Sequence, residues 1–364
     1  MTSVVLPPNT VTVVGAGSWG TAAAHILSHK CETVYLWAAR SEIVAQIKET
    51  GRNQEYLPGV DLRPNVLAIN RLESGLLDSP LFVWAIPIEF LRERLRMFAP
   101  HLRKNIIAVN LGKGIEEGSS ATPSEILSQE CSDLRAFGSL VGPNIASEVA
   151  AGMYAQATLG LSEPGCLDAV AACFSTDTFR VETTTDVRGI EIGAALKNMC
   201  AIAAGLCDGL ALGANTKSLV IAESIAEIRD IGAVLGAEPR TLESGGMLAD
   251  LLTSSYSLSG RNRRVGEYLG AGNSLEGAMS LLGGRVAEGV ATCRACYGLQ
   301  VRLGLSFPVI DSLNALLNGE CSANACVHRI LLGRPTQAPG SAGNRGVTDA
   351  AGRSHGRPAP SLVN

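Results

Sequence analysis

A glycine-rich turn near the start of the chain leaves few folds open to it. Residues 11–20 read VTVVGAGSWG, an apolar run followed by Gly-x-Gly-x-x-Gly, and an alanine-rich segment, residues 21–27, comes next. In this context Gly15 makes the tight turn, Gly17 lets the backbone approach a pyrophosphate, and Gly20 lets the helix pack on the strand. The helix N-terminus offers free N–H groups to phosphates. The pattern predicts a Rossmann-type dinucleotide site; a plain strand–helix turn is the alternative.

The end of the second predicted strand should decide which dinucleotide binds. An acidic residue there would bind the ribose hydroxyls of NAD. Residues 37–41 read WAARS instead, and the first acid is Glu42. Arg40 and Ser41 suit a 2′-phosphate, so NADP is predicted as a cofactor alongside NAD. The alternative is that Arg40 only stacks on adenine.

The chain changes character near residue 187. Before it, short β-rich runs (11–14, 33–37, 81–85, 106–109, 138–141 and 179–182) alternate with helical stretches (19–29, 42–49, 90–97 and 123–128). This alternation predicts a parallel-rich sheet with helices on both faces. After it, long segments rich in Ala, Leu and Gly (189–206, 216–235, 275–303 and 308–317) predict an all-α domain.

Two domains with short tails are therefore expected, and a chain of 364 residues exceeds the usual size of a single core. An α/β Rossmann-type domain is predicted over residues 11–187 and an all-helical catalytic domain over residues 188–332. Residues 1–10 are predicted to be an N-terminal tail. Residues 333–364, rich in Gly, Pro, Ser and Arg, are predicted to be disordered or a surface tail.

Charge and apolar content limit the classes of partner. A formal net charge of −4 argues against nucleic acid or an anionic membrane as the main partner. No apolar stretch approaches the ~20 residues that span a bilayer, and the nearest, residues 201–212, is interrupted by Asp208, so stable membrane insertion is not expected. Residues 1–10 lack the pattern of a signal peptide, which favours the cytoplasm.

The ten cysteines are expected to be buried free thiols, since a chain of this size needs no disulfide scaffold. Cys293 and Cys296 form a Cys-x-x-Cys pair, but no partner ligands follow at zinc-finger spacing. We therefore expect no metal.

One lysine lies in an otherwise apolar segment. Lys197 lies within GAALKNMCAIAAG, where burial would lower its pKa and make a neutral amine accessible. Such an amine can act as the base that oxidation of a secondary alcohol requires. A second cation at the same pocket, Lys113, would lower the pKa further. The alternative is a lysine that extends to the surface from the edge of a helix.

A basic segment, Gly260–Arg264 in GRNRR, follows a Ser- and Gly-rich turn. A guanidinium binds phosphate oxygens in a bidentate fork, and a helix that begins at Arg261 and Asn262 would add its dipole. A solvated basic surface is the alternative, and Arg263 and Arg264 are expected to be structural.

Several collinear motifs over residues 10–320 resemble the soluble NAD(P)-dependent glycerol-3-phosphate dehydrogenase family. They are NQEYLPG (53–59), WAIP (84–87), GKGIE (112–116), GPNIASEV (142–149), GAALKNMCAIAAG (193–205) with Asp208-Gly209 and residues 213–215, DLLTSSYSLSGRNRRVG (250–266) and Glu288-Gly289. The resemblance implies a 6-phosphogluconate-dehydrogenase-like fold and reversible hydride transfer between sn-glycerol 3-phosphate and NAD(P)⁺. It also implies a cytoplasmic homodimer that supplies glycerol 3-phosphate for phospholipid synthesis.

The resemblance carries site roles onto matching positions. It assigns Lys197 as the general acid/base, Asp250 as the carboxylate that orients it, and Lys113 beside the substrate. The implied substrate-binding residues are Lys113, Asn144, Asn198, Ser254, Arg261 and Asn262. The implied cofactor-binding residues are Gly15, Gly17, Ser18, Trp19, Gly20, Arg40, Pro87, Lys113, Arg261 and Glu288.

Some positions depart from the family pattern. Ser254 stands where threonine is usual, Arg63 where proline is common, and Met153-Tyr154-Ala155 at the place of a Pro-Thr pair. These departures bear on substrate affinity and loop rigidity. Two other functions stay open: a related two-domain dehydrogenase of a hydroxy acid or polyol, and a non-catalytic NAD(P)H sensor.

Overall fold

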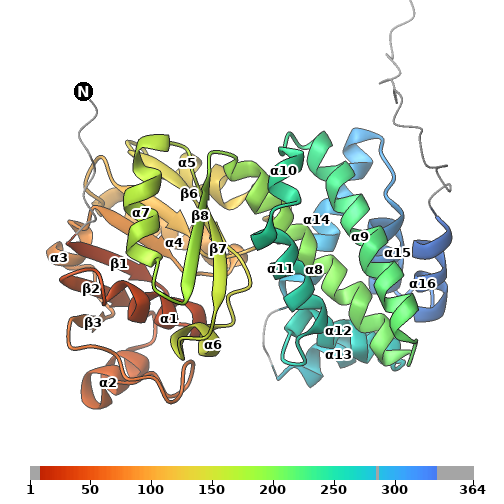
Figure 1. Ribbon diagram of the computed structural model, residues 1–364, viewed down its shortest axis with the longest axis horizontal. Coiled ribbons are helices and arrows are strands. Elements are labelled where there is room, and N and C mark those ends of the chain that lie inside the picture. Colours follow the sequence, from red (N-terminus) through yellow and green to blue (C-terminus); the bar gives the residue numbers. More distant parts are fainter. Residues whose placement is uncertain (1–8, 284–286, 334–364) are drawn as a thin grey trace, which may run out of the picture. The chain divides into compact units, whose positions relative to one another are not determined.

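The computed structural model describes residues 9–283 and 287–333 (Figure 1). Most of the predicted N-terminal tail (residues 1–8) and of the predicted C-terminal tail (residues 334–364) lies outside the described residues.

The N-terminal half is built on one eight-stranded sheet of order β3-β2-β1-β4-β5-β6-β7-β8. The strands are β1 (Thr10–Val14), β2 (Thr33–Trp37), β3 (Val66–Ile69), β4 (Leu81–Trp84), β5 (Ile107–Asn110), β6 (Ala136–Val141), β7 (Ala155–Leu161) and β8 (Phe179–Thr184). Only β6 and β7 pair antiparallel; the other neighbours are parallel. The predicted parallel-rich sheet is confirmed.

Two of the eight strands are absent from the sequence prediction. Strand β3 has four residues, and β7 reads AQATLGL, in which Ala and Gly have low strand propensity. Strand β7 forms because it pairs with β6 on one side and β8 on the other. Pairing partners of this kind are tertiary information that local composition does not contain.

The strand order reverses at β1. Strand β1 lies between β2 and β4: β2 and β3 are added on one side of it, and β4 and the following strands on the other. In open α/β sheets, ligands bind outside the carboxyl ends of the strands at this reversal. The glycine-rich turn after Val14 and the WAIP segment that ends β4 both lie there.

Helices cover both faces of the sheet (Figure 1). They are α1 (Ser18–Leu27), α2 (Ser41–Thr50), α3 (Ser74–Leu77), α4 (Ile88–Phe98), α5 (Pro123–Glu130), α6 (Ala146–Ala150) and α7 (Leu167–Phe174), with 3₁₀ turns at Ala99–His101 and Pro164–Cys166. Alternate strand residues enter different cores: Val13 and Val83 belong to one cluster, and Val14 and Trp84 to another. Two-sided burial explains why these strands are almost wholly apolar.

The C-terminal half is helical, as predicted. It contains α8 (Val187–Gly209), α9 (Ala214–Val234), α10 (Pro239–Leu242), α11 (Gly245–Tyr256), α12 (Arg261–Gly270), α13 (Leu275–Leu281), α14 (Glu288–Leu303), α15 (Pro308–Leu317) and α16 (Ala323–Leu332). The predicted single segment 275–303 is wrong, because α13 ends at Leu281 and α14 begins at Glu288. The division into domains at residues 187 and 188 stays a prediction.

Helix α8 is the central helix of this half. It has 23 residues and is apolar on all sides, as expected for a helix surrounded by others. Its length and hydropathy are those of a membrane-spanning helix, contrary to the expectation that no segment is long enough. Its apolar window is 100% buried inside the protein, which accounts for this composition without a bilayer.

Helices α8 and α12 touch through their backbones. A Cβ on Gly205 of α8 would lie 1.9 Å from the Arg263 carbonyl oxygen, and a Cβ on Gly266 of α12 would lie 2.0 Å from the Ile202 carbonyl oxygen. Only glycine allows this approach. It fixes the start of α12, with Arg261 and Asn262, relative to the helix that carries Lys197.

The prediction that the cysteines are buried free thiols is confirmed for nine of the ten. All ten cysteines are free; nine are buried and Cys321 is half-buried. Within residues 9–283 and 287–333, no group of three or more His, Cys, Asp or Glu side chains could hold a metal ion.

Candidate active site

The glycine-rich turn has the geometry of a dinucleotide site. Gly15 has φ +114°, and a Cβ there would lie 2.4 Å from the Ala85 carbonyl oxygen at the end of β4. A Cβ on Gly20 would lie 1.9 Å from the Gly15 carbonyl oxygen. Gly17 is the N-cap of α1. A Cβ added there would have no heavy atom within 4 Å, so this position faces open space at the helix N-terminus. The turn therefore fits a pyrophosphate approaching Gly17.

These glycines give a matched pair of variants. Gly20→Ala is expected to destabilise the protein by about 1–3 kcal/mol, because its methyl group meets a backbone oxygen that cannot move freely. Gly17→Ala should cost less than about 1 kcal/mol but weaken NAD(P)H binding, since the methyl group fills the open space. Thermal unfolding and NADH fluorescence titration measure both effects. Equal unfolding temperatures for the two variants would contradict this account.

A buried asparagine that sequence reasoning did not single out holds this turn. Asn53, fully buried, donates its Nδ2 to the Ala16 carbonyl oxygen (2.9 Å) and to Thr21 Oγ1 (2.8 Å). It begins the NQEYLPG motif, so a polar residue at the start of that motif was the available signal. Asn53 ties this loop to the turn and to the first helix.

Arg40 follows β2, as the cofactor prediction requires, but it is already engaged. Its Nη1 lies 2.5 Å from Glu55 Oε1 and 3.4 Å from the Tyr56 hydroxyl, and the side chain is half exposed. The guanidinium lowers the pKa of Glu55 through this hydrogen bond. A 2′-phosphate would compete with Glu55 for Arg40.

Two lysines and one aspartate meet where the turn that carries Lys113 lies against α8 and α11. Asp250 Oδ1 accepts from Lys197 Nζ (2.7 Å), and Asp250 Oδ2 accepts from Lys113 Nζ (2.6 Å). Lys113 also donates to the Gly142 carbonyl oxygen (2.9 Å), and Lys197 donates to Ser254 Oγ (2.6 Å). The Asp250 and Lys197 side chains are 3% and 7% exposed, and that of Lys113 is 17% exposed.

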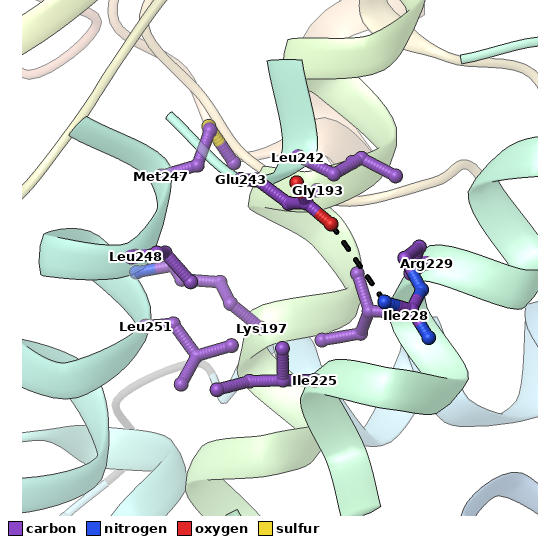
Figure 2. Close-up of a pocket in the computed structure, with 10 residues that line it drawn as sticks. All are labelled: Gly193, Lys197, Ile225, Ile228, Arg229, Leu242, Glu243, Met247, Leu248 and Leu251. Atoms are coloured by element: carbon purple, nitrogen blue, oxygen red, sulfur yellow. Dashed lines mark ion pairs between the residues drawn. The ribbon is translucent and has the colours of Figure 1, made fainter. Parts of the chain in front are cut away.

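The surroundings of Lys197 favour its neutral form. Burial lowers the pKa of Lys197 to about 8; the Asp250 carboxylate raises the pKa and the Lys113 ammonium lowers it. The apolar wall that causes the desolvation is visible in Figure 2, where the lysine stem lies among Ile225, Leu248 and Leu251. This pocket between α8, α9, α10 and α11 has only one other cation, Arg229, which pairs with Glu243 (3.7 Å). It is therefore poorly suited to the substrate phosphate.

Two asparagines among the predicted substrate-binding residues have buried amide atoms without a partner in the described part of the chain. Asn198 Nδ2 is buried and unpaired, and both polar atoms of the Asn144 amide are buried and unpaired. Buried amides are normally hydrogen-bonded, so an unpaired one fits a ligand oxygen or carboxamide. The substrate-binding roles of Asn144 and Asn198 stay predictions.

Arg261 and Asn262 open helix α12, so the condition for a contribution from its dipole is met. Asn262 Oδ1 accepts from the Gly289 backbone N–H (2.9 Å), and a Cβ on Gly289 would lie 2.9 Å from the Asn198 carbonyl oxygen. Arg261 Nη2 lies 3.3 Å from Glu288 Oε1. The start of α12, the start of α14 and the Asn198 turn of α8 thus meet around Gly289.

Arg263 is structural, as predicted. Its side chain is 6% exposed, and it pairs with Asp208 (2.7 Å) and Glu267 (3.1 Å). Lys217 completes this cluster, with its Nζ 2.8 Å from Asp208 Oδ2.

Comparison with known proteins identifies the family of this chain. Two family models match consecutive parts of the chain: the N-terminus of NAD-dependent glycerol-3-phosphate dehydrogenase over residues 10–166, and its C-terminus over residues 186–328. The glycerol-3-phosphate dehydrogenase [NAD(P)+] of Moorella thermoacetica is 36% identical over 88% of this chain and 95% of its own length. This chain belongs to the glycerol-3-phosphate dehydrogenase family.

Other members of the glycerol-3-phosphate dehydrogenase family show the same likeness. The Geobacter sulfurreducens protein of this name is 36% identical over 88% of this chain and 96% of its own. The crystal structure of the Coxiella burnetii glycerol-3-phosphate dehydrogenase superposes with a TM-score of 0.84 at 26% identity, covering 89% of this chain and 99% of that one. The predicted fold class, a Rossmann-type domain followed by a helical domain, is confirmed.

In this glycerol-3-phosphate dehydrogenase family member, hydrogen bonds directly join Lys113, Lys197, Asp250 and Ser254. Arg261, Asn262 and Glu288 form a second group around Gly289, and the glycine-rich turn, with Ser18 and Trp19 in the first turn of α1, forms a third. Pro87 is the N-cap of α4 at the end of β4. Arg40 stands apart, with Glu55. The predicted roles of these residues stay proposals.

Proposed function

We propose that this chain reversibly oxidises sn-glycerol 3-phosphate to dihydroxyacetone phosphate with NAD(P)⁺. The observation that carries the proposal is the buried Lys197 amine, hydrogen-bonded to Asp250 and Ser254, with the unpaired amide nitrogen of Asn198 next to it in the sequence. The group that takes or gives a proton and the groups that orient it are therefore in one place.

The chain's own residues supply the acid–base chemistry. Lys197 takes the hydroxyl proton during oxidation and returns a proton to the carbonyl oxygen during reduction. Asp250 holds the amine through Oδ1, and Ser254 supplies the hydroxyl that threonine supplies elsewhere in the family. The nicotinamide, when bound, accepts or donates the hydride.

The first turn of α12 is suited to the substrate phosphate. Arg261 provides a guanidinium, and the helix of ten residues directs its N-terminal N–H groups and positive dipole end to the same place. Lys113 adds a second cation next to Asp250. An unphosphorylated polyol would bring no phosphate charge to these groups.

The decisive assay follows NADH and NADPH oxidation with dihydroxyacetone phosphate, in parallel with dihydroxyacetone. Turnover is expected with the phosphorylated substrate and at least 100-fold lower kcat/KM without the phosphate, because charge-assisted contacts would be lost. Equal rates with both substrates would favour a polyol dehydrogenase. Tight NADH binding without any turnover would favour a sensor.

Cofactor choice is tested at Arg40. With NADPH, Arg40→Ala is expected to raise KM about tenfold, since a hydrogen bond to a charged group contributes about 1.5–3 kcal/mol. With NADH, KM should change less than twofold, and steady-state kinetics with both cofactors measures the difference. If KM rises equally for both, Arg40 stacks on adenine instead.

We also propose a cytoplasmic homodimer that supplies glycerol 3-phosphate for phospholipid synthesis, with domains over residues 11–187 and 188–332. The support is the family resemblance together with the change of architecture at α8. Size-exclusion chromatography with light scattering tests the dimer: a mass near 37.9 kDa at assay concentrations would exclude it.

A further inference from the structure

A row of buried polar side chains joins helix α8 to the turn that carries Lys113. Glu191 lies on α8, six positions before Lys197, and is 2% exposed. Ser139 of β6 donates its hydroxyl to Glu191 Oε1 (2.5 Å). Asn110, the last residue of β5, donates its Nδ2 to Ser139 Oγ (3.2 Å). None of these three side chains belongs to the predicted site.

Asn110 holds the next turn of the chain from two sides. Its Nδ2 donates to the Gly112 carbonyl oxygen (2.7 Å), and its Oδ1 accepts from the Gly112 N–H (3.1 Å). Gly112 is also packed against the Ile86 carbonyl oxygen, from which a Cβ would be only 2.4 Å away. Gly112 directly precedes Lys113, so the Asn110 amide sets the point from which the lysine side chain leaves the backbone.

The Glu191 carboxylate sets which groups donate and which accept along this row of hydrogen bonds. Glu191 accepts from the Ser139 hydroxyl, from the Ser124 hydroxyl (2.6 Å) and from the Ser124 N–H (3.0 Å). Since the Ser139 hydroxyl donates to Glu191, its oxygen is left to accept from an N–H group. The Asn110 amide must therefore present Nδ2 to Ser139, which is the only orientation that also gives Oδ1 to the Gly112 N–H.

From this geometry we infer that Glu191 and Ser139 are positioning residues for Lys113, acting through Asn110. Glu191 and Lys197 lie on the same helix, so the Glu191 carboxyl group fixes the position of Lys113 relative to Lys197. Both amines bind Asp250. The inference rests on the proposed function only in that Lys113 contacts the substrate.

Two serines on the same carboxyl group provide a matched test. Ser139→Ala removes the contact that leads to Asn110, and Ser124→Ala removes the other hydroxyl contact, which does not lead there. In Ser139→Ala we expect KM for dihydroxyacetone phosphate to rise about three- to tenfold, the equivalent of one lost hydrogen bond, with the Kd for NADH unchanged. In Ser124→Ala we expect wild-type KM despite a comparable loss of stability.

A double-mutant cycle separates positioning from general disruption. In a Lys113→Ala background, Ser139→Ala should have no further effect on KM, because the side chain it positions is gone. An undiminished effect in that background, or equal KM changes in the two serine variants, would overturn the inference.

Amide hydrogen exchange tests the inference without substrate. In Ser139→Ala, exchange of residues 110–114 should be faster than in the wild type and in Ser124→Ala, because the Gly112 N–H loses its fixed acceptor. Unchanged exchange there would refute the inference even in an active enzyme. Failure of the wild type to oxidise NAD(P)H with dihydroxyacetone phosphate would refute the proposed function and leave the exchange result to decide the inference.

Discussion

Lys197→Ala is expected to lower kcat for reduction of dihydroxyacetone phosphate by about 10²–10⁴-fold, the usual contribution of a positioned acid or base. The dinucleotide turn is formed by other elements, so the Kd for NADH should stay at its wild-type value. Steady-state kinetics and NADH fluorescence measure the two quantities. Lys217→Ala is the matched control, because Lys217 is also a buried lysine paired with an aspartate, and we expect its kcat to remain near wild type.

The pH dependence should report the same amine. Burial lowers the pKa of Lys197 to about 8, while Asp250 and Lys113 act on it in opposite directions. Oxidation needs the neutral amine, so its kcat/KM should rise with pH and level off above about 8. Reduction needs the ammonium, so its kcat/KM should fall above about 8. A break near the ordinary lysine pKa of about 10.4, or a wild-type profile in Lys197→Ala, would remove Lys197 from this role.

Asp250→Asn should have the second large effect. The carboxylate is buried between two ammonium groups, and breaking such an arrangement from one side costs about 3–5 kcal/mol. Loss of its charge lowers the pKa of Lys197 further, so less ammonium is present at neutral pH to protonate the carbonyl oxygen. We expect kcat/KM for reduction to fall at least 100-fold and its pH break to move below 8.

Asp208 offers a control of similar construction. It pairs with Lys217 and Arg263 in the same helical half, and no step of the proposed mechanism involves it. Asp208→Asn should lower the unfolding temperature but keep the pH break near 8. If both variants shift the pH break, general loosening of the helices explains the result better than a specific pairing of Asp250 with Lys197.

Local sequence predicts those parts of the fold that local forces specify. The strands at residues 11–14 and 33–37 are apolar runs bounded by turns, and two-sided burial makes such runs easy to recognise. Strand β7 is different, because its Ala and Gly residues carry little strand propensity and its partners are distant in sequence. Helix α12 is polar at its start, and its position depends on close contact with α8.

In the candidate site, too, local sequence predicts single residues but not the contacts between distant parts of the chain. Lys197 could be predicted because a lysine in an apolar helix is unusual, and Gly15 and Gly20 because a spaced glycine pattern has a known geometry. The meeting of Lys113 with Asp250 joins residues 137 positions apart, and the sequence suggested only that both lie at the substrate pocket. Asn110, Ser139 and Glu191 each look ordinary alone, and their connection is visible only once β5, β6 and α8 are assembled.

The backbone contact between α8 and α12 has a consequence for selectivity. At Gly205 and Gly266 backbone meets backbone, with no side chain at these points that could yield, so we expect the Lys197 amine and the first turn of α12 to keep a fixed spacing. On the proposed function, this pair of helices selects the substrate by length, because the number of bonds between its reacting carbon and its phosphate must match the spacing between the amine and α12. A phosphorylated alcohol longer by one carbon would place its hydroxyl beyond the amine, whatever its affinity for the arginine.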